Sequence, residues 1–182
     1  MVRIIIGLIL VLFDLNLGAE NVILGLFPDF IGYILMFFGM KSLEIHSESY
    51  KKNKMFMLPS AILTYALYMG NLYGIILSWP LMANMLITSF TILLKVVTSY
   101  MIVAGDKEIE RNNANKLGAM RMEYIWRVYA LCSFFLIVAQ CLQIGPMYIL
   151  MALSIAVSGI VFIVYTSQTA IIYSELKRNN RL

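Results

Sequence analysis

The chain has 182 residues, of which 61% are hydrophobic and 13% charged, and its formal net charge at pH 7 is +4. Soluble domains carry roughly 25% charged residues, so this composition excludes an ordinary soluble domain and predicts an integral membrane protein. The positive net charge does not indicate nucleic-acid binding, because in a membrane protein the placement of Lys and Arg matters more than their sum.

Six apolar segments predict six transmembrane helices, and hence an all-α membrane protein that forms a single integral membrane domain, 1–182. Crossing a hydrocarbon core of about 30 Å takes roughly 20 helical residues. Each of the four prolines lies at the start of a segment, where its missing N–H leaves no helical hydrogen bond unmade. The predicted spans are 3–18, 28–46, 57–78, 81–104, 124–144 and 147–174.

The first span is short, because a helix over residues 3–18 covers only about 22 Å. The stretch LGAENVILGLF separates it from Pro28. We expect residues 19–27 either to continue the first helix with a tilt or to form a short re-entrant or interfacial helix. Irregular backbone at membrane depth must be shielded by protein or must line a wet cavity.

The distribution of basic residues predicts the orientation of the chain. Thirteen of the fourteen Lys and Arg residues lie at the very start of the first span, after the last span, or around the 2–3 and 4–5 connections, and the other three connections contain none. Basic residues are enriched on the cytoplasmic side. We therefore expect a multi-pass protein of the bacterial inner membrane with both termini in the cytoplasm.

The fourteenth basic residue, Lys95, lies inside the predicted span 81–104. Helical rise places Lys95 and Asp14 both about 15 Å from the cytoplasmic boundary. Ionisable groups in spans usually face a partner or a cavity, so an intramembrane Asp14–Lys95 ion pair is our hypothesis. The alternatives are snorkelling of Lys95 to the inner interface and a place for Asp14 near the outer end of a tilted helix.

Acidic, carboxamide and tyrosine side chains gather on the predicted outer half, where the connections contain no Lys or Arg. Asp29 lies in the first turn of a predicted helix, where a carboxylate interacts favourably with the helix dipole. Contact with a ligand is the alternative role. A concave outer pocket so lined would suit a cation or a small polar ligand. The bland alternative is polar helix ends and interfacial tyrosines. The candidate ligand-binding residues are Asp14, Asn16, Glu20, Asp29, Tyr33, Tyr68 and Asn71.

Glycines recur every seven residues from Gly18 to Gly39. Small residues let membrane helices approach closely, so we expect Gly32 and Gly39 to form a packing face on the second span. The GNLYG pair, Gly70 and Gly74, is the candidate partner.

The motifs of common enzymes are absent from the sequence. It has no serine-nucleophile motif, no HExxH and no phosphate-binding loop, and His46 is its only histidine. The cysteines, Cys132 and Cys141, lie about 13 Å apart along one helix and cannot form a disulfide. We therefore expect no enzyme, no cofactor, no metal and no nucleic-acid partner. The expected partner is the lipid bilayer, with another membrane subunit or a homo-oligomer left open.

The segment FPDFIGYILMFFGMKSL resembles small, uncharacterised bacterial multi-pass proteins that carry PDFIGY after a short first span. The overall plan is also similar to the S-components of energy-coupling factor transporters, although the first span has no Ala-x-x-x-Ala docking pair. That similarity implies a transport component that binds a small ligand from outside. The alternative is a non-catalytic accessory, immunity or assembly subunit of a membrane complex.

Overall fold

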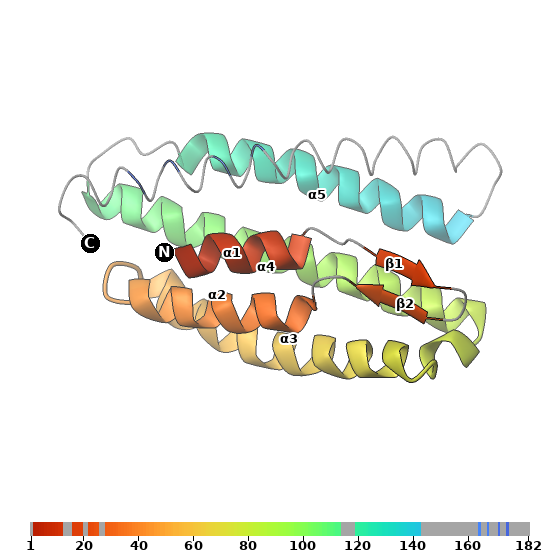
Figure 1. Cartoon of the computed structure of the whole chain (residues 1–182). Coiled ribbons are helices and arrows are strands. Elements are labelled where there is room, and N and C mark those ends of the chain that lie inside the picture. Colours follow the sequence, from red (N-terminus) through yellow and green to blue (C-terminus); the bar gives the residue numbers. More distant parts are fainter. Residues whose placement is uncertain are drawn as a thin grey trace.

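The computed structural model describes residues 2–12, 16–19, 22–25, 28–113 and 119–142, and the single positions 164, 167, 171 and 174. Its continuous segments are mainly α-helical, with one short 3-10 helix and one β-hairpin (Figure 1). The expected helical class is confirmed. The elements are α1 (Val2–Leu12), β1 (Asn16–Ala19), β2 (Val22–Gly25), α2 (Asp29–Leu43), α3 (Glu48–Leu72), η1 (Ile76–Ser78), α4 (Leu81–Asn113) and α5 (Ala119–Leu142).

Three of these helices, α3, α4 and α5, are long and apolar enough to cross a membrane. They support a membrane protein, whereas the count of six spans is not confirmed. The α1 and α2 helices are shorter than the predicted spans, at about 16 and 22 Å. The predicted span 147–174 lies outside the described residues, except for four helical positions.

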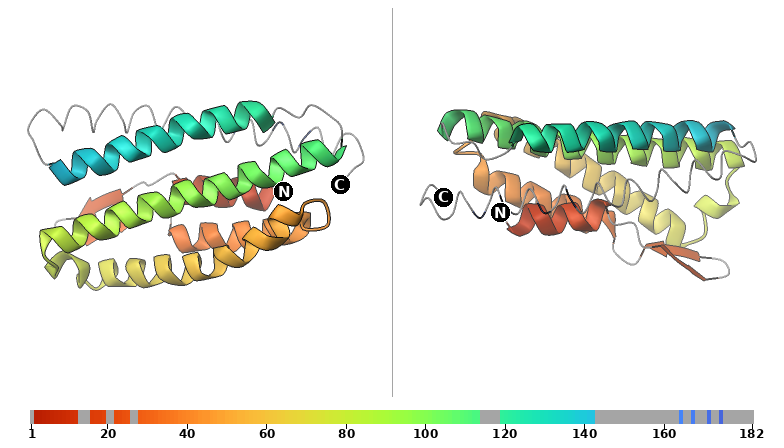
Figure 2. Two further views of the ribbon diagram at one scale, coloured as in Figure 1. Left: turned by 180° about the vertical axis from the view of Figure 1, so that it is seen from behind. Right: turned by 90° about the horizontal axis from the view of Figure 1, so that it is seen from above.

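The helices pack as a layered bundle. The α2 helix contacts both α1 and α3, while α4 contacts both α3 and α5 (Figure 2). The α1 and α2 helices run along only part of the longer α3 and α4. Because α1 and α2 are short, one half of the bundle contains neither of them.

The β-hairpin lies in that half, beyond the ends of α1 and α2 (Figure 1). Its strands are antiparallel, with Asn16 opposite Gly25 and Ala19 opposite Val22, and β2 contacts α3. A helix was expected in this part of the chain, and for the described positions of 19–27 that prediction is wrong. Two glycines and β-branched side chains lower the helix propensity of NLGAENVILG, and strand pairing satisfies the backbone groups between β1 and β2.

Glycines allow α1 and α2 to approach closely. A Cβ added at Gly32 would lie 2.7 Å from the carbonyl oxygen of Gly7, and one at Gly39 would meet the Ile4 side chain. The partner of this glycine face is therefore α1. It is not the pair on α3 that the sequence suggested, because Gly70 faces the Ile76 side chain and Gly74 forms a turn with φ +70°.

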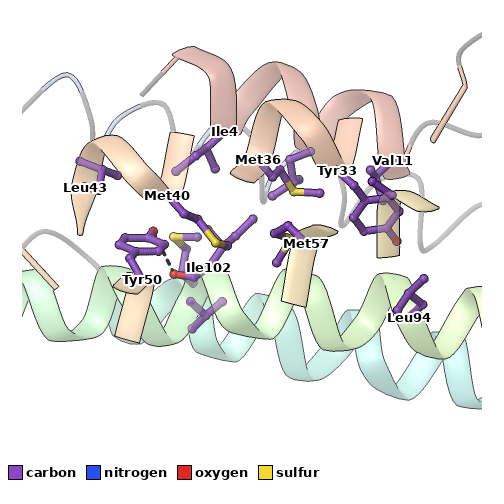
Figure 3. Close-up of a cluster of buried hydrophobic side chains, with 14 of the residues drawn as sticks. Ile4, Val11, Tyr33, Met36, Met40, Leu43, Tyr50, Met57, Leu94 and Ile102 are labelled. Carbon is purple, nitrogen blue, oxygen red and sulfur yellow. Dashed lines mark hydrogen bonds between the residues drawn. The ribbon is translucent and has the colours of Figure 1, made fainter. Parts of the chain in front are cut away.

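The core between α2, α3 and α4 is rich in methionine. Met36, Met40 and Met57 are fully buried, and they lie between the two buried tyrosines Tyr33 and Tyr50 (Figure 3). Methionine fills irregular spaces with a flexible apolar chain. Each tyrosine brings a polar hydroxyl to one end of this apolar core, and a polar cluster surrounds each of them.

Candidate functional site

The first polar cluster is built on an ion pair between α2 and α4. The Lys95 Nζ lies 3.1 Å from the Asp29 Oδ2, and these side chains are only 11% and 22% exposed. Pro28 precedes α2 in an extended conformation, and its carbonyl accepts the Ile31 N–H. Pro28 thus starts the helix as expected, and Asp29 falls in its first turn, where a negative charge is favourable.

The pair lies partway along the bundle and not at its end. Lys95 comes fourteen residues after Leu81, the first residue of α4, which corresponds to about 21 Å of helix. The sequence placed Asp29 at the outer start of a full-length span. Asp29 reaches Lys95 because α2 begins partway along α4. Asp14, the partner proposed for Lys95 from the sequence, lies outside the described residues.

Tyr33 lies one turn after Asp29 and is fully buried. Its hydroxyl makes no hydrogen bond with any residue that the structure describes. Thr98 of α4 lies near it and donates to the carbonyls of Leu94 and Lys95. A buried hydroxyl without a partner is costly, so the Tyr33 hydroxyl is a polar group that a ligand could satisfy.

Aromatic rings from α3 surround the start of α2. The Phe30 ring packs edge to face on Tyr65 and on Tyr68, with centroid distances of 5.2 and 5.8 Å. Tyr68 is therefore brought next to the Asp29 turn, and the half-buried Asn71 follows it on α3. Sequence reasoning did not assign Phe30 a role, since an aromatic residue in an apolar run carries no signal of its neighbours.

The other candidate residues are not placed at this pair. Asn16 pairs opposite Gly25 in the hairpin, and its side chain is not described. Asp14 and Glu20 lie outside the part of the chain that the structure describes. The structure thus gathers Asp29, Tyr33 and Tyr68 from the predicted set and adds Lys95 to them.

The second polar cluster joins the far end of α4 to the start of α3. The buried Tyr50 hydroxyl donates to the Asp106 Oδ1 at 2.6 Å, and the Tyr50 ring packs on Gly105. Glu108 accepts hydrogen bonds from the Ser47 hydroxyl and the Ser49 N–H, each at 2.7 Å. These contacts are possible because α4 continues to Asn113, beyond the apolar span predicted for 81–104.

Glu108 lies past that apolar stretch, and its electrostatics are set by the hydrogen bonds. The Ser47 hydroxyl and the Ser49 N–H favour the charged carboxylate and lower the pKa of Glu108 to about 2. The carboxylate thereby caps the N-terminus of α3 from another helix. A cap of this kind satisfies N–H groups that have no partner inside the helix, so we assign this cluster to structure.

The comparisons with known proteins leave function to the geometry. The chain matches no protein-family model, no curated protein and no solved structure. Among the described residues, no group of three or more His, Cys, Asp or Glu side chains could hold a metal ion. The resemblances drawn from PDFIGY and from the six-span plan stay predictions.

Proposed function

We propose that this chain is a multi-pass protein of the bacterial inner membrane that binds a small polar ligand from the outer side as a component of a transport system. The Asp29–Lys95 pair is the centre of the binding site, and Tyr33 and Tyr68 contribute to it. The observation that carries the proposal is the pair itself, two opposite charges held 3.1 Å apart inside an apolar bundle.

An ion pair in this environment is a poor device for stability. Desolvation of two charges offsets most of their attraction, and apolar side chains of similar volume often stabilise a protein as well or better. Ionisable residues within membrane spans are costly and mark ligand or ion pathways. A pair placed here is therefore better explained by ligand binding than by packing.

The interrupted architecture near the pair supports the same proposal. Transporters often bind substrate where a helix stops partway through the membrane, because the helix terminus then offers polar groups at that depth. The first turn of α2 lies partway along α4, and the hairpin occupies the bundle beyond it. The end of the bundle at η1 has no Lys or Arg in the connection 73–80, which favours it as the outer side.

Ligand-dependent stabilisation tests the proposal. The purified protein in lipid nanodiscs is heated with a panel of vitamins, amines, amino acids and metal ions, since a ligand that binds only the folded state raises the midpoint of unfolding. We expect at least one compound to stabilise the wild type and to lose its effect in Asp29→Asn and Lys95→Met. Glu48→Gln, at an exposed pair with Lys52, is the control. A panel that leaves the wild-type midpoint unchanged contradicts the proposal.

The outer surface of the helices favours a second candidate, an accessory or assembly subunit of a membrane complex. Large apolar side chains of α4 and α5 are exposed, among them Phe90, Leu93, Leu131 and Phe134. Such a surface suits lipid or a partner helix. A stoichiometric membrane protein that co-purifies with the chain, together with wild-type function of Asp29→Asn, would favour this candidate.

A further inference from the structure

We infer that the ligand of this site is a small zwitterion that carries both an ammonium and a carboxylate group. The inference rests on the proposed function and specifies its ligand class. The pair presents two opposite charges side by side, with the Asp29 Oδ2 and the Lys95 Nζ 3.1 Å apart. A zwitterion is the ligand class whose two charges match both of them.

Charge balance disfavours ligands with a single charge. An amine that takes Asp29 from Lys95 would deprive the lysine of this partner, and a carboxylate that takes Lys95 would do the same to Asp29. Breaking an ion pair of low exposure is unfavourable because each charge loses the attraction of the other. A zwitterion that enters between the two side chains gives each of them a new partner of opposite sign.

The side chains of the pair are partly exposed, unlike that of their neighbour Tyr33. Asp29 and Lys95 keep 22% and 11% of their side-chain surface exposed, whereas Tyr33 is 0% exposed. A ligand would therefore meet the charged groups first. The Tyr33 hydroxyl, which makes no hydrogen bond with any described residue, could then donate to the ligand carboxylate.

Aromatic rings next to Asp29 suit the cationic end of such a ligand. Phe30 adjoins Asp29 in the chain and packs on Tyr65 and Tyr68. Ammonium groups are attracted to aromatic faces. The ammonium group would thus lie at Asp29 on the aromatic side, and the carboxylate at Lys95 on the α4 side.

Matched probes test the ligand class. L-phenylalanine, phenethylamine and 3-phenylpropionate share one aromatic body and carry both charges, the cation alone or the anion alone. Glycine, methylamine and acetate form the same series without the ring. Their dissociation constants are measured by isothermal titration calorimetry on the full chain in nanodiscs. We expect a zwitterion to bind wild type at least tenfold more tightly than its single-charge analogues.

Variants of the pair should change which ligand class binds most tightly. Lys95→Met removes the cation, so we expect the amine of the series to bind more tightly than the zwitterion. Asp29→Asn should turn the preference to the carboxylate. The charge-exchanged variant Asp29→Lys/Lys95→Asp keeps a pair, so it should recover zwitterion binding and should fold even where a single change does not. Circular dichroism checks the fold of each variant.

The outcomes separate this inference from the proposed function. Tighter wild-type binding of an amine, a carboxylate or a panel compound without both charges overturns the zwitterion and leaves the proposed function standing. Zwitterion binding that is unchanged in both single variants also overturns the inference, because the pair then does not contact the ligand. If neither the matched probes nor the broad panel binds, both proposals fail.

Discussion

At the scale of single residues, pairing depends on where each helix begins. Lys95 is the only charged residue in the apolar segment 81–104, so the sequence suggested a partner for it, with snorkelling to the inner interface as the alternative. Helix spacing suggested Asp14, which lies outside the described residues, and gave no indication of Asp29. Asp29 was assigned to an outer helix end because its segment looked like a full span. The α2 helix begins where the sequence predicted, but that start lies partway along α4, and this brings the Asp29 carboxylate to Lys95.

Glu108 is the residue whose titration has a direct structural consequence. Its pKa is lowered from an ordinary value of about 4.5 to about 2 by hydrogen bonds to the charged form. A lowered pKa in the folded state means that the carboxylate contributes stability above its unfolded pKa, and that this contribution is lost as the pH falls toward 2. A histidine or lysine with a raised pKa would behave in the opposite way, because its contribution to stability is lost as the pH rises.

We predict that Glu108→Gln lowers the unfolding midpoint at neutral pH, and that the difference from wild type shrinks between about pH 4.5 and about pH 2. Toward the acidic end the wild-type carboxyl becomes protonated, and its protonated form is neutral like the glutamine. Thermal unfolding in nanodiscs across this range measures the effect. Glu48→Gln is the matched control, since its partner Lys52 is 72% exposed and exposed pairs contribute little. A wild-type–variant difference that is independent of pH contradicts the prediction.

At the scale of elements, glycine spacing identified a packing face but not its partner. Gly32 and Gly39 lie where the seven-residue repeat predicts one helix face, yet the surface they meet is α1, through Gly7 and Ile4. A single glycine in a short helix was too weak a signal in the sequence. The GNLYG motif was the stronger pattern, but Gly74 lies in the turn after α3, with φ +70°.

The α1–α2 contact predicts a large effect of the smallest substitution. In Gly32→Ala the new Cβ would lie 2.6 Å from the Val11 Cγ2 and 2.7 Å from the Gly7 carbonyl oxygen. Backbone cannot move aside as a side chain can, so we expect a loss of about 1–3 kcal/mol in the free energy of unfolding. Reversible unfolding in mixed micelles measures it.

Gly70→Ala is the matched control for this prediction. Its Cβ would meet only the side chain of Ile76, at 3.0 Å, and alanine is the better helix former by about 1 kcal/mol. We expect this variant to unfold within about 0.5 kcal/mol of wild type. Equal destabilisation by Gly32→Ala and Gly70→Ala would show that the α1–α2 glycines do not limit the approach of the helices.

The hairpin shows where helix prediction fails at the element scale. Strands β1 and β2 are four residues each, too short for their alternation to be read against the apolar background of a membrane protein. The short first span did indicate that something other than a plain helix follows it. What forms there depends on pairing between two segments and on contact with α3, and neither is visible in local composition.

At the scale of the whole molecule, composition and hydropathy predicted the helical class and a long helix in each of the regions of α3, α4 and α5. This prediction is possible because a backbone exposed to lipid must form its hydrogen bonds within its own helix. A long apolar run therefore predicts a helix. The start of the third span was wrong, because α3 begins at Glu48 and Pro59 lies inside it. Residues 28–46 were also taken as a full span, whereas α2 has only 15 residues. Residues 3–18 were expected to form a short span, and α1 is shorter still, with 11 residues. Hydropathy reports burial in apolar surroundings and cannot separate a spanning helix from one that stops partway.

The proposed orientation makes a prediction about the two ends of α3. The helix carries Lys51, Lys52 and Lys54 near its start and is followed by a connection without basic residues. Its 25 residues correspond to about 37 Å, enough to place the ends on opposite sides of a membrane. Because basic residues are retained on the cytoplasmic side, we expect the start of α3 inside and η1 outside.

Single cysteines measure this directly. In a Cys132→Ala/Cys141→Ala background, Ser78→Cys in η1 should react with a membrane-impermeant maleimide added to intact spheroplasts. Lys52→Cys should react only after the membrane is permeabilised. The Lys52 side chain is 72% exposed and Ser78 is also exposed, so failure to label would reflect sidedness and not burial, and full labelling after permeabilisation is the internal control. The reverse pattern would place the Asp29–Lys95 site in reach of the cytoplasm, and the ligand would then have to enter from inside.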